Sequence, residues 1–337
     1  MVQDMRKIRR KKQRRYLTPL LFIFNVVLWT AALYLWGQDI DIPPETTDIF
    51  AIEANINALE TEPLTGFNNS LVLTIADVSV DLYSTHALLV NLDTGDILFD
   101  HRGNERAYPA SVTKIMTVLV GLEHATSDEL VVYADFEALH QANSAMAGFV
   151  YGETRTLSEV LHASMLSSGA DATTTLAYHV AGSYQGFVDL MNETALRLGM
   201  YDTNFVNASG LHDDNQYTTA YDIALLLNYA LEHEYFREIF TTPTYLFVNS
   251  DGDEQVMEST MFRNMPQVVF NGGEILGGKT GYTTPAGLCL ASIATDGTNE
   301  FALITFGATP AGSELLEHIS DAFTVYEYFF NLGNDSD

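Results

Sequence analysis

Hydrophobic and polar residues follow two different periods along this chain, and the period changes twice. Towards both ends of its C-terminal three quarters, short apolar runs bounded by turn residues predict β-strands. Between them, apolar residues recur every three to four positions, which predicts helices. The strands are expected at His86–Leu92, Asp96–His101, Glu274–Thr284, Gly287–Ala294 and Glu300–Ala308, and the helices at Thr156–Leu166, Phe187–Met200, Thr219–His233 and Leu315–Gly333.

Strands at both ends with helices between them predict an α+β fold, in which one antiparallel sheet is built from both ends of the domain and receives a helical insertion. The first two strands are joined by Asp93-Thr94-Gly95, a sequence suited to a tight hairpin turn. The same three residues spell the aspartic-protease signature. That chemistry requires two carboxylates that share a proton, and no second such motif exists, so a turn is the better interpretation.

The N-terminus has the pattern of a membrane anchor. Residues 16–37 contain no charge and are long enough to span a bilayer as a helix. The basic segment 1–15 precedes them and predicts a cytoplasmic N-terminus, with the rest of the chain outside the cell membrane. The acidic, proline-containing segment 38–80 is interpreted as a stem. A signal peptide cleaved near Ala32 is the alternative, but the apolar run is longer than a usual signal core.

Charge and cysteine content exclude other classes of protein. Of 16 Lys and Arg residues, eight lie between Arg6 and Arg15, and the chain from Tyr16 onwards carries eight against 43 Asp and Glu, a net charge of −35. A body this acidic repels phosphate backbones, which argues against nucleic-acid binding. The single cysteine, Cys289, cannot form an internal disulfide.

The stretch "PASVTKIMT", Pro109–Thr117, places Ser111 and Lys114 three residues apart. On a helix this spacing puts both side chains on one face. A serine hydroxyl becomes a good nucleophile when a base accepts its proton, and a lysine can be that base if burial lowers its pKa. The apolar residues that follow would provide such burial.

The scarcity of lysine strengthens this interpretation. After Lys12 the chain contains only two lysines, Lys114 and Lys279. Lys279 lies in "GGKTGYTT", Gly277–Thr284, in the predicted strand. An acidic domain that almost lacks lysine therefore keeps it in an S-x-x-K and in a K-T-G motif.

These two motifs resemble those of the serine penicillin-binding proteins and β-lactamases, whose signature is S-x-x-K, S-D-N and K-T-G. The resemblance is closest to the low-molecular-mass D-alanyl-D-alanine carboxypeptidases. It also rests on "GETRTLSEVLHASMLSSGADA" and "NASGLHDDNQYTTAYDIALL" and covers residues 81–333. It implies a β-lactamase/DD-peptidase-like fold, peptidoglycan stem peptides ending in D-Ala-D-Ala as substrates, and β-lactams as covalent inhibitors.

The resemblance also implies a role for each motif residue. Ser111 would be the nucleophile, Lys114 its proton acceptor and Ser168 the proton relay to the leaving amine. The substrate's terminal carboxylate would be held in the strand, where Gly281 leaves room for the peptide and the backbone N–H groups of Ser111 and Tyr282 form the oxyanion hole. The substrate-binding residues implied in this way are Lys279, Thr280, Gly281 and Tyr282.

The middle motif departs from the family pattern. It reads Ser168-Gly169-Ala170, whereas the family usually has asparagine in the third position. An asparagine there would contact the substrate amide and the motif lysine. Its absence removes a positioning group, and Ser167 is a second candidate for the relay.

Two other functions remain open at this stage. One is a β-lactamase of the same fold, although no E-x-x-x-N segment follows the middle motif at a suitable position. The other is a penicillin-binding sensor module with impaired catalysis, marked by Ala170. No H-E-x-x-H motif is present, and we expect neither a metal nor another cofactor.

Overall fold

The computed structural model describes residues 66–334, apart from 69–71, 75–76, 79, 127, 134–138, 140–141, 249–251, 266 and 312–315. The basic segment 1–15 and the predicted span 16–37 lie outside the described residues, as does most of the segment 38–80. Among the helices that are described, none has both the length and the apolar composition needed to cross a bilayer.

The main elements occur in the order that the hydrophobic pattern predicts, strands first, then helices, then strands and a last helix, but two short strands lie within the helical part. The strands are β1 (His86–Asn91), β2 (Ile97–His101), β3 (Glu129–Val131), β4 (Thr154–Thr156), β5 (Thr244–Val248), β6 (Glu254–Glu258), β7 (Val269–Phe270), β8 (Gly273–Thr283), β9 (Gly287–Thr295) and β10 (Glu300–Ala308). The helices are η2 (Ala110–Thr113), α3 (Lys114–His124), α5 (Leu157–Met165), α6 (Ala170–Ala181), α7 (Tyr184–Arg197), α8 (Ala220–Ala230), α9 (Glu234–Thr241), η3 (Phe262–Asn264) and α10 (Glu317–Asn334).

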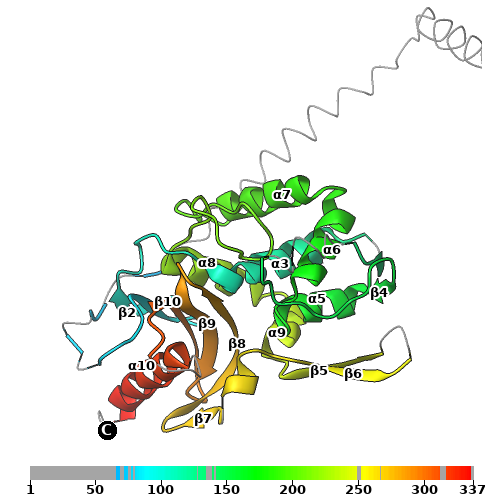
Figure 1. The fold of residues 1–337 in the computed structure, drawn as a ribbon. Helices are drawn as coiled ribbons and strands as arrows, with labels where there is room; N and C mark the ends of the chain where they lie inside the picture. The colour runs from blue at the N-terminus through cyan, green and yellow to red at the C-terminus, as the bar shows by residue number, and fades with distance from the viewer. Residues whose placement is uncertain are drawn as a thin grey trace, which may run out of the picture. The chain divides into compact units, whose positions relative to one another are not determined.

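A six-stranded antiparallel sheet is assembled from both ends of the described chain (Figure 1). Its strand order is β2-β1-β10-β9-β8-β7, so the first hairpin joins the last strand. β1 pairs with β10 over its whole length, with Leu89 opposite Leu303. This arrangement confirms the predicted α+β fold with a helical insertion.

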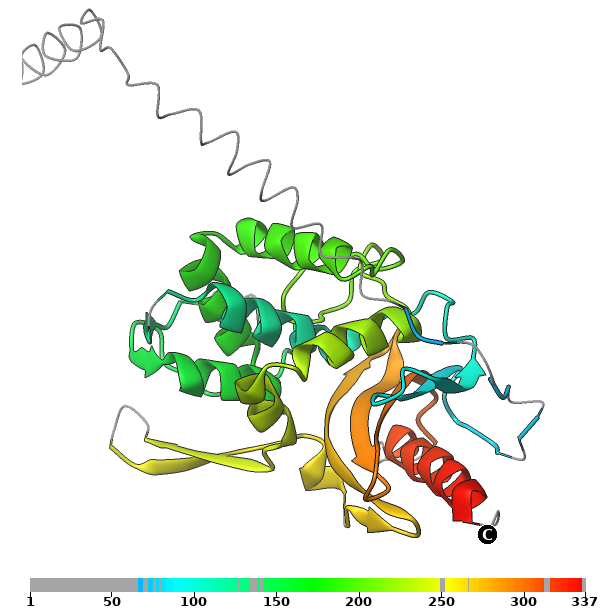
Figure 2. The same ribbon diagram turned by 180° about the vertical axis from the view of Figure 1, so that it is seen from behind.

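Helices cover both faces of this sheet, as Figures 1 and 2 show from opposite sides. Successive side chains of a strand point to opposite faces. In β1, Leu88 and Val90 pack in a core shared with α3 and α8, whereas Ala87 and Leu89 pack in a second core with α10. Both faces of the strand are therefore apolar, which explains its continuous hydrophobic run.

Two helices of the insertion, α5 and α8, begin at threonine caps. Thr156 accepts a hydrogen bond from the backbone N–H of Glu159 at 3.1 Å, and the Glu159 carboxylate accepts one from the Thr156 N–H at 2.8 Å. This reciprocal capping box starts α5. The Thr219 hydroxyl caps α8 by accepting from the Asp222 N–H. The predicted starts at Thr156 and Thr219 are thus the residues just before the observed helices.

The β5–β6 hairpin is absent from the sequence prediction. Its inner face carries Tyr245 and Phe247, which pack against the core, while Leu246, Val248 and Val256 are exposed on the other face. Apolar residues on both faces hide the period of two that would mark a half-buried strand. Figure 1 shows the hairpin leading away from the six-stranded sheet and running below α5 and α9.

Part of the segment 38–80, interpreted above as a stem, packs on the domain. Asn68 and Leu73 form isolated parallel bridges with the β1–β2 hairpin. Val78 and Val80 are buried in the core beneath α10. The folded part of the chain therefore begins before the boundary inferred from the sequence, because these apolar side chains close an edge of the core.

Candidate active site

Ser111 lies in the short 3-10 helix η2, directly before α3. Its neighbour Ala110 has a positive φ of 45°, an unusual conformation for a residue with a side chain. The Thr113 hydroxyl donates to the Ala110 carbonyl at 2.8 Å and helps to hold the turn. Lys114 follows as the first residue of α3, so serine and lysine are one turn apart.

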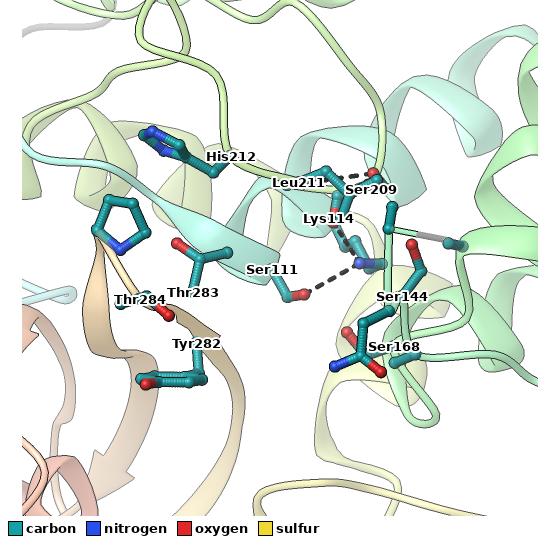
Figure 3. A pocket seen from close by; sticks show the side chains of 16 residues that line it. Ser111, Lys114, Ser144, Ser168, Ser209, Leu211, His212, Tyr282, Thr283 and Thr284 are labelled. Atoms are coloured by element: carbon teal, nitrogen blue, oxygen red, sulfur yellow. Dashed lines mark hydrogen bonds between the residues drawn. The ribbon is translucent and has the colours of Figure 1, made fainter. Parts of the chain in front are cut away.

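The Lys114 amine contacts the serine hydroxyl. Its Nζ donates to Ser111 Oγ at 3.1 Å and to the Ser209 carbonyl (Figure 3). The side chain is 2% exposed. Burial lowers the pKa of Lys114 well below its ordinary value, and the charge of Lys279 lowers it further, while Asp171 raises it. A neutral amine beside a serine hydroxyl can accept its proton.

A turn at residues 207–210 presents the Ser209 carbonyl to Lys114. The Asn207 carboxamide oxygen accepts from the backbone N–H groups of Ser209 at 3.2 Å and Gly210 at 2.7 Å, and its nitrogen donates to the Leu211 carbonyl. Gly210 has a φ of +81°, and a Cβ placed on it would lie 1.9 Å from the Ala110 carbonyl oxygen. This position is therefore restricted to glycine.

The Gly210→Ala variant is expected to lose both stability and activity. The left-handed φ alone costs about 1–2 kcal/mol, and the clash forces η2 away from the turn, lowering kcat at least about tenfold. Thermal unfolding measures the stability, and release of D-alanine from the stem peptide that the family resemblance implies measures the activity. The matched control is Gly182→Ala, with a φ of +69° but nothing within 4 Å of the added Cβ. It should lose stability but keep its kcat, and equal kcat values for the two variants would contradict the steric argument.

A pocket of about 620 Å³ opens over the serine and lysine. Figure 3 shows Lys114, Ser144 and Ser168 on one side of Ser111 and Tyr282 to Thr284 on the other. Four residues predicted for the site contribute to the wall, namely Ser111, Lys114, Ser168 and Tyr282. The pocket is lined by Ser111, Lys114, Ala142, Asn143, Ser144, Ala145, Ser168, Ala170, Ser209, Gly210, Leu211, His212, Tyr282, Thr283, Thr284 and Pro285.

The predicted residues Lys279, Thr280 and Gly281 lie in β8 next to η2, and they do not line this pocket. Lys279 is 1% exposed, its Nζ donates to the Thr280 carbonyl, and burial lowers its pKa to about 7. The Thr280 hydroxyl is 2.8 Å from the Thr260 hydroxyl. A Cβ on Gly281 would lie 2.7 Å from the Ser111 backbone nitrogen, so the strand approaches η2 as closely as its backbone permits.

Ser168 lies in the turn between α5 and α6. It has a φ of +58° and is 5% exposed, and its hydroxyl has no hydrogen-bond partner in the described part of the protein. A buried hydroxyl without a partner is costly, which favours a bound group at this point. The pocket wall contains Ser168 and not Ser167. This geometry favours Ser168 as the relay candidate.

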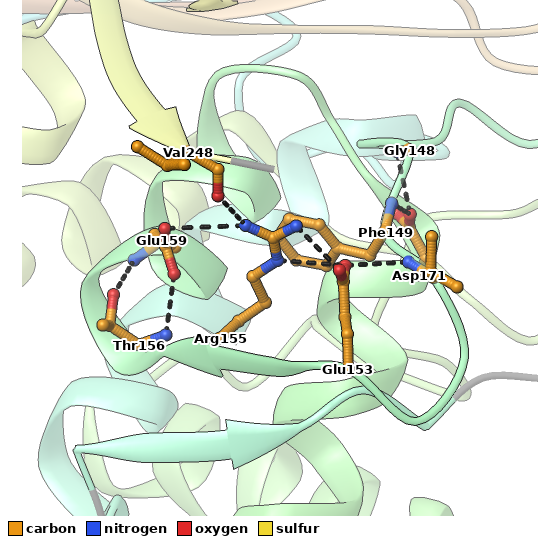
Figure 4. A network of polar contacts seen from close by, with 9 residues as sticks. Gly148, Phe149, Glu153, Arg155, Thr156, Glu159, Asp171 and Val248 are labelled. Carbon is orange, nitrogen blue, oxygen red and sulfur yellow. Dashed lines mark hydrogen bonds and ion pairs between the residues drawn. The ribbon is translucent and has the colours of Figure 1, made fainter. Parts of the chain in front are cut away.

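Behind this wall lies a buried network around Arg155 (Figure 4). The guanidinium is bidentate to Glu153 at 2.9 and 2.8 Å, approaches Glu159 at 3.7 Å and donates to the Val248 carbonyl at 2.5 Å. It also lies 5.2 Å from the centroid of the Phe247 ring. Arg155 thereby links β4 and α5 to the β5–β6 hairpin.

Replacing Arg155 with alanine is expected to lower the free energy of unfolding by about 3 kcal/mol, because two mostly buried carboxylates, with side chains 10% and 15% exposed, lose their partner. Chemical denaturation measures this change. The matched control is Arg106→Ala, whose ion pair with Asp202 is exposed and should contribute no more than about 1 kcal/mol. Equal losses in the two variants would contradict a structural role for the buried network.

Sequence reasoning assigned no role to several lining residues. These come from the loop before α6, from the turn after Asn207 and from the end of β8 and the residue after it, and they are Asn143, Ser144, Ser209, His212, Thr283 and Thr284. The turn belonged to a stretch that already resembled the family, "NASGLH", so a signal for it existed. The loop at 142–145 carried no such signal.

Comparison with known proteins places this geometry in a family. Residues 73–310 match the family described as D-alanyl-D-alanine carboxypeptidase. D-alanyl-D-alanine carboxypeptidase DacF of Bacillus subtilis is 32% identical over 248 residues, which are 72% of this chain and 62% of the relative. The corresponding DacB2 of Mycobacterium tuberculosis is 28% identical over 73% of this chain and 81% of its own length.

Solved structures of similar proteins have the same fold. The Streptomyces K15 DD-transpeptidase superposes with a TM-score of 0.67 at 23% identity, covering 75% of this chain and 99% of that chain, and supports the fold. A D-alanyl-D-alanine carboxypeptidase from Mycobacterium tuberculosis gives a TM-score of 0.65 at 25% identity, covering 80% and 95%. The chain spans about 62% of the length of the Bacillus relative. Because the family match covers residues 73–310, more than half of the chain, this chain belongs to the D-alanyl-D-alanine carboxypeptidase family, peptidase family S11.

Proposed function

We propose that this protein is a serine D-Ala-D-Ala carboxypeptidase that removes the terminal D-alanine from peptidoglycan stem peptides. One observation carries the proposal. The buried Lys114 amine, with its pKa lowered by burial and by Lys279, contacts Ser111 Oγ at 3.1 Å in the wall of an open pocket. The names of the family and of the relatives in Bacillus and Mycobacterium support the same reaction.

In the first step, Ser111 Oγ attacks the carbonyl carbon of the penultimate D-alanine. The oxygen–carbon bond forms while the hydroxyl proton passes to the neutral Lys114 amine. The negative charge that develops on the carbonyl oxygen requires donors, for which the backbone N–H groups of Ser111 and Tyr282 are the candidates. The approach of Gly281 to Ser111 supports this assignment, since it brings β8 and η2 together.

In the second step, the bond between the carbonyl carbon and the leaving nitrogen breaks. The nitrogen takes a proton that started on Ser111, passed on from Lys114 through the Ser168 hydroxyl, and D-alanine leaves. Water then attacks the ester on Ser111, its proton returns to the serine oxygen through Lys114, and the shortened peptide is released. Lys279 and Thr280 are proposed to hold the terminal carboxylate during acylation.

The proposal includes an extracytoplasmic location at the cell membrane. An uncharged run at 16–37 after a basic segment would tether the domain by a single span. Peptidoglycan substrates lie outside this membrane, so the location and the reaction support each other. Two experiments test this location. A membrane-impermeant reagent should label the chain in intact cells if the domain lies outside the membrane, and the chain should be recovered with the membrane fraction if the span tethers it.

Mass spectrometry of the protein with benzylpenicillin, together with D-alanine release from a stem pentapeptide, tests the reaction. We expect a stoichiometric covalent adduct and steady release of D-alanine. Rapid hydrolysis of nitrocefin would instead indicate a β-lactamase. An adduct without any D-alanine release would indicate a penicillin-binding sensor, and neither adduct nor release would contradict the proposed function.

A further inference from the structure

The pocket wall is apolar where an asparagine is typical of this site. Ala170 follows Ser168-Gly169 and lines the pocket, but it offers only a methyl group. The S-D-N motif places a carboxamide at this position. A peptide substrate carries amide N–H and carbonyl groups, and each of them loses its hydrogen bonds to water when it is bound against a methyl group.

A neighbouring loop brings a carboxamide to the same pocket. Among the described residues that line it, Asn143 has the single carboxamide side chain, and Ser144 follows it. The loop is attached directly to the apolar position, because the Ala170 backbone N–H donates to the Ala145 carbonyl at 2.8 Å. Ala170, which lacks a carboxamide, is therefore hydrogen-bonded to the loop at Ala145, two residues from Asn143, which has one.

The loop is held in place from behind by Asp171, the residue after Ala170. Its buried carboxylate accepts from the backbone N–H groups of Ala147 at 2.8 Å and of Gly148 and Phe149 at 3.1 Å (Figure 4). The turn before α6 also packs closely against the loop, since a Cβ on Gly169 would lie 2.9 Å from the Ala147 nitrogen. These contacts fix the loop from Ala145 to Phe149, and a group attached next to a fixed backbone loses less conformational freedom on binding a substrate.

The loop also places an unpartnered hydroxyl in the wall. Ser144 Oγ is buried and has no hydrogen-bond partner within the described residues, which is also true of Ser168 Oγ. Figure 3 shows both serines on the side of the pocket where Lys114 lies. Buried polar atoms in native proteins nearly always have partners, so two unpartnered hydroxyls in one wall favour a polar ligand between them.

We propose that Asn143 is the substrate-binding residue that supplies, from the loop, the carboxamide missing at position 170. Its amide binds the peptide backbone of the substrate, and the Ser144 hydroxyl completes this part of the wall. The assignment rests on the proposed carboxypeptidase function and names the residue that orients the substrate in it.

A double-mutant cycle tests the assignment through kcat/KM for D-alanine release. Asn143 has a φ of +51°, so Asn143→Gly removes the amide without straining the backbone. We expect this variant to lose about 10- to 100-fold in kcat/KM at unchanged melting temperature. Adding Ala170→Asn to it should restore the rate to within about threefold of wild type, because either position can then carry the amide.

The matched control is Arg102→Gly, which changes another residue of positive φ, 58°, outside the pocket, and should leave kcat/KM unchanged. Asn143→Asp gives a second reading, since it keeps the shape but removes the N–H donors and should also lower kcat/KM. An active wild type with Asn143→Gly within twofold of it, or no rescue by Ala170→Asn, would overturn this assignment alone. A wild type that neither releases D-alanine nor binds penicillin would overturn the proposed function together with it.

Discussion

Replacing Ser111 with alanine is expected to abolish covalent labelling by penicillin and to lower kcat for D-alanine release by at least about 10⁴-fold. The acyl-enzyme requires an oxygen at this position, and among the described residues Ser111 has the one hydroxyl that is hydrogen-bonded to the Lys114 amine. Lys114 Nζ contacts Ser111 Oγ and the Ser209 carbonyl, so only the Ser111 hydroxyl is activated in this contact. Substrate affinity should change little, because the rest of the pocket stays intact.

Intact-mass measurement followed by peptide mapping checks this result. The adduct on the wild-type protein should map to the peptide that contains Ser111, and not to the other serines of the pocket, Ser144, Ser168 and Ser209. The control is Ser320→Ala, an exposed serine of α10 outside the pocket, which should label and turn over as the wild type does. A Ser111→Ala protein that still labels with penicillin would contradict the assignment of the nucleophile.

The serine–lysine pair could be predicted because the contact is local. A spacing of three residues fixes the separation of the two side chains within one helical turn, and the apolar run of α3 provides the burial. The β8 motif could be predicted for a different reason. Lysine is so rare in this chain that its occurrence in K-T-G carried information.

The remaining groups of the site depend on contacts that the sequence does not encode locally. The Ser209 carbonyl that binds Lys114 belongs to a residue 95 positions away, and a backbone carbonyl has no residue type that a motif could display. Its position depends on Asn207, whose side chain shapes the turn. Asn143 likewise lies in the pocket wall on a loop that Asp171 binds at Ala147 and Gly148, a contact between distant parts of the sequence.

The two lysines are linked through charge as well as through position. Both are almost completely buried, and the positive charge of Lys279 lowers the pKa of Lys114. Burial and a like charge both lower the pKa of Lys114, whereas burial alone lowers that of Lys279, so we expect Lys114 to lose its proton first, as its proposed role as a base requires. Lys279, with a pKa of about 7, keeps its charge to higher pH, as the binding of a carboxylate requires.

This separation predicts a bell-shaped dependence of kcat/KM on pH. Activity rises with pH as Lys114 loses its proton, because only the neutral amine accepts the Ser111 proton. Activity falls above about pH 7 as Lys279 loses its proton, because the neutral amine no longer attracts the substrate carboxylate. In the kcat profile the alkaline limb should lie at higher pH, since the bound carboxylate stabilises the charged form of Lys279.

The Lys279→Met variant should change this profile in two ways. Its alkaline limb near pH 7 should disappear, and its acid limb should move to higher pH, because Lys114 loses the like charge that lowers its pKa. We expect kcat/KM for the stem pentapeptide to fall about 100-fold or more, with the increase in KM contributing, since a buried charged partner of the carboxylate is removed. Methionine fills a similar volume without a charge, so the fold should be retained.

The control is the same peptide with an amidated C-terminus, which has no carboxylate to bind. The wild-type protein should process it poorly, and the Lys279→Met variant should process it no worse than the wild type does. A variant that keeps the alkaline limb near pH 7 would show that another group titrates there. Lys279 is the buried cation of β8 whose charge acts on Lys114. If the variant without it still preferred the free carboxylate by as much as the wild type does, other residues would have to hold the carboxylate.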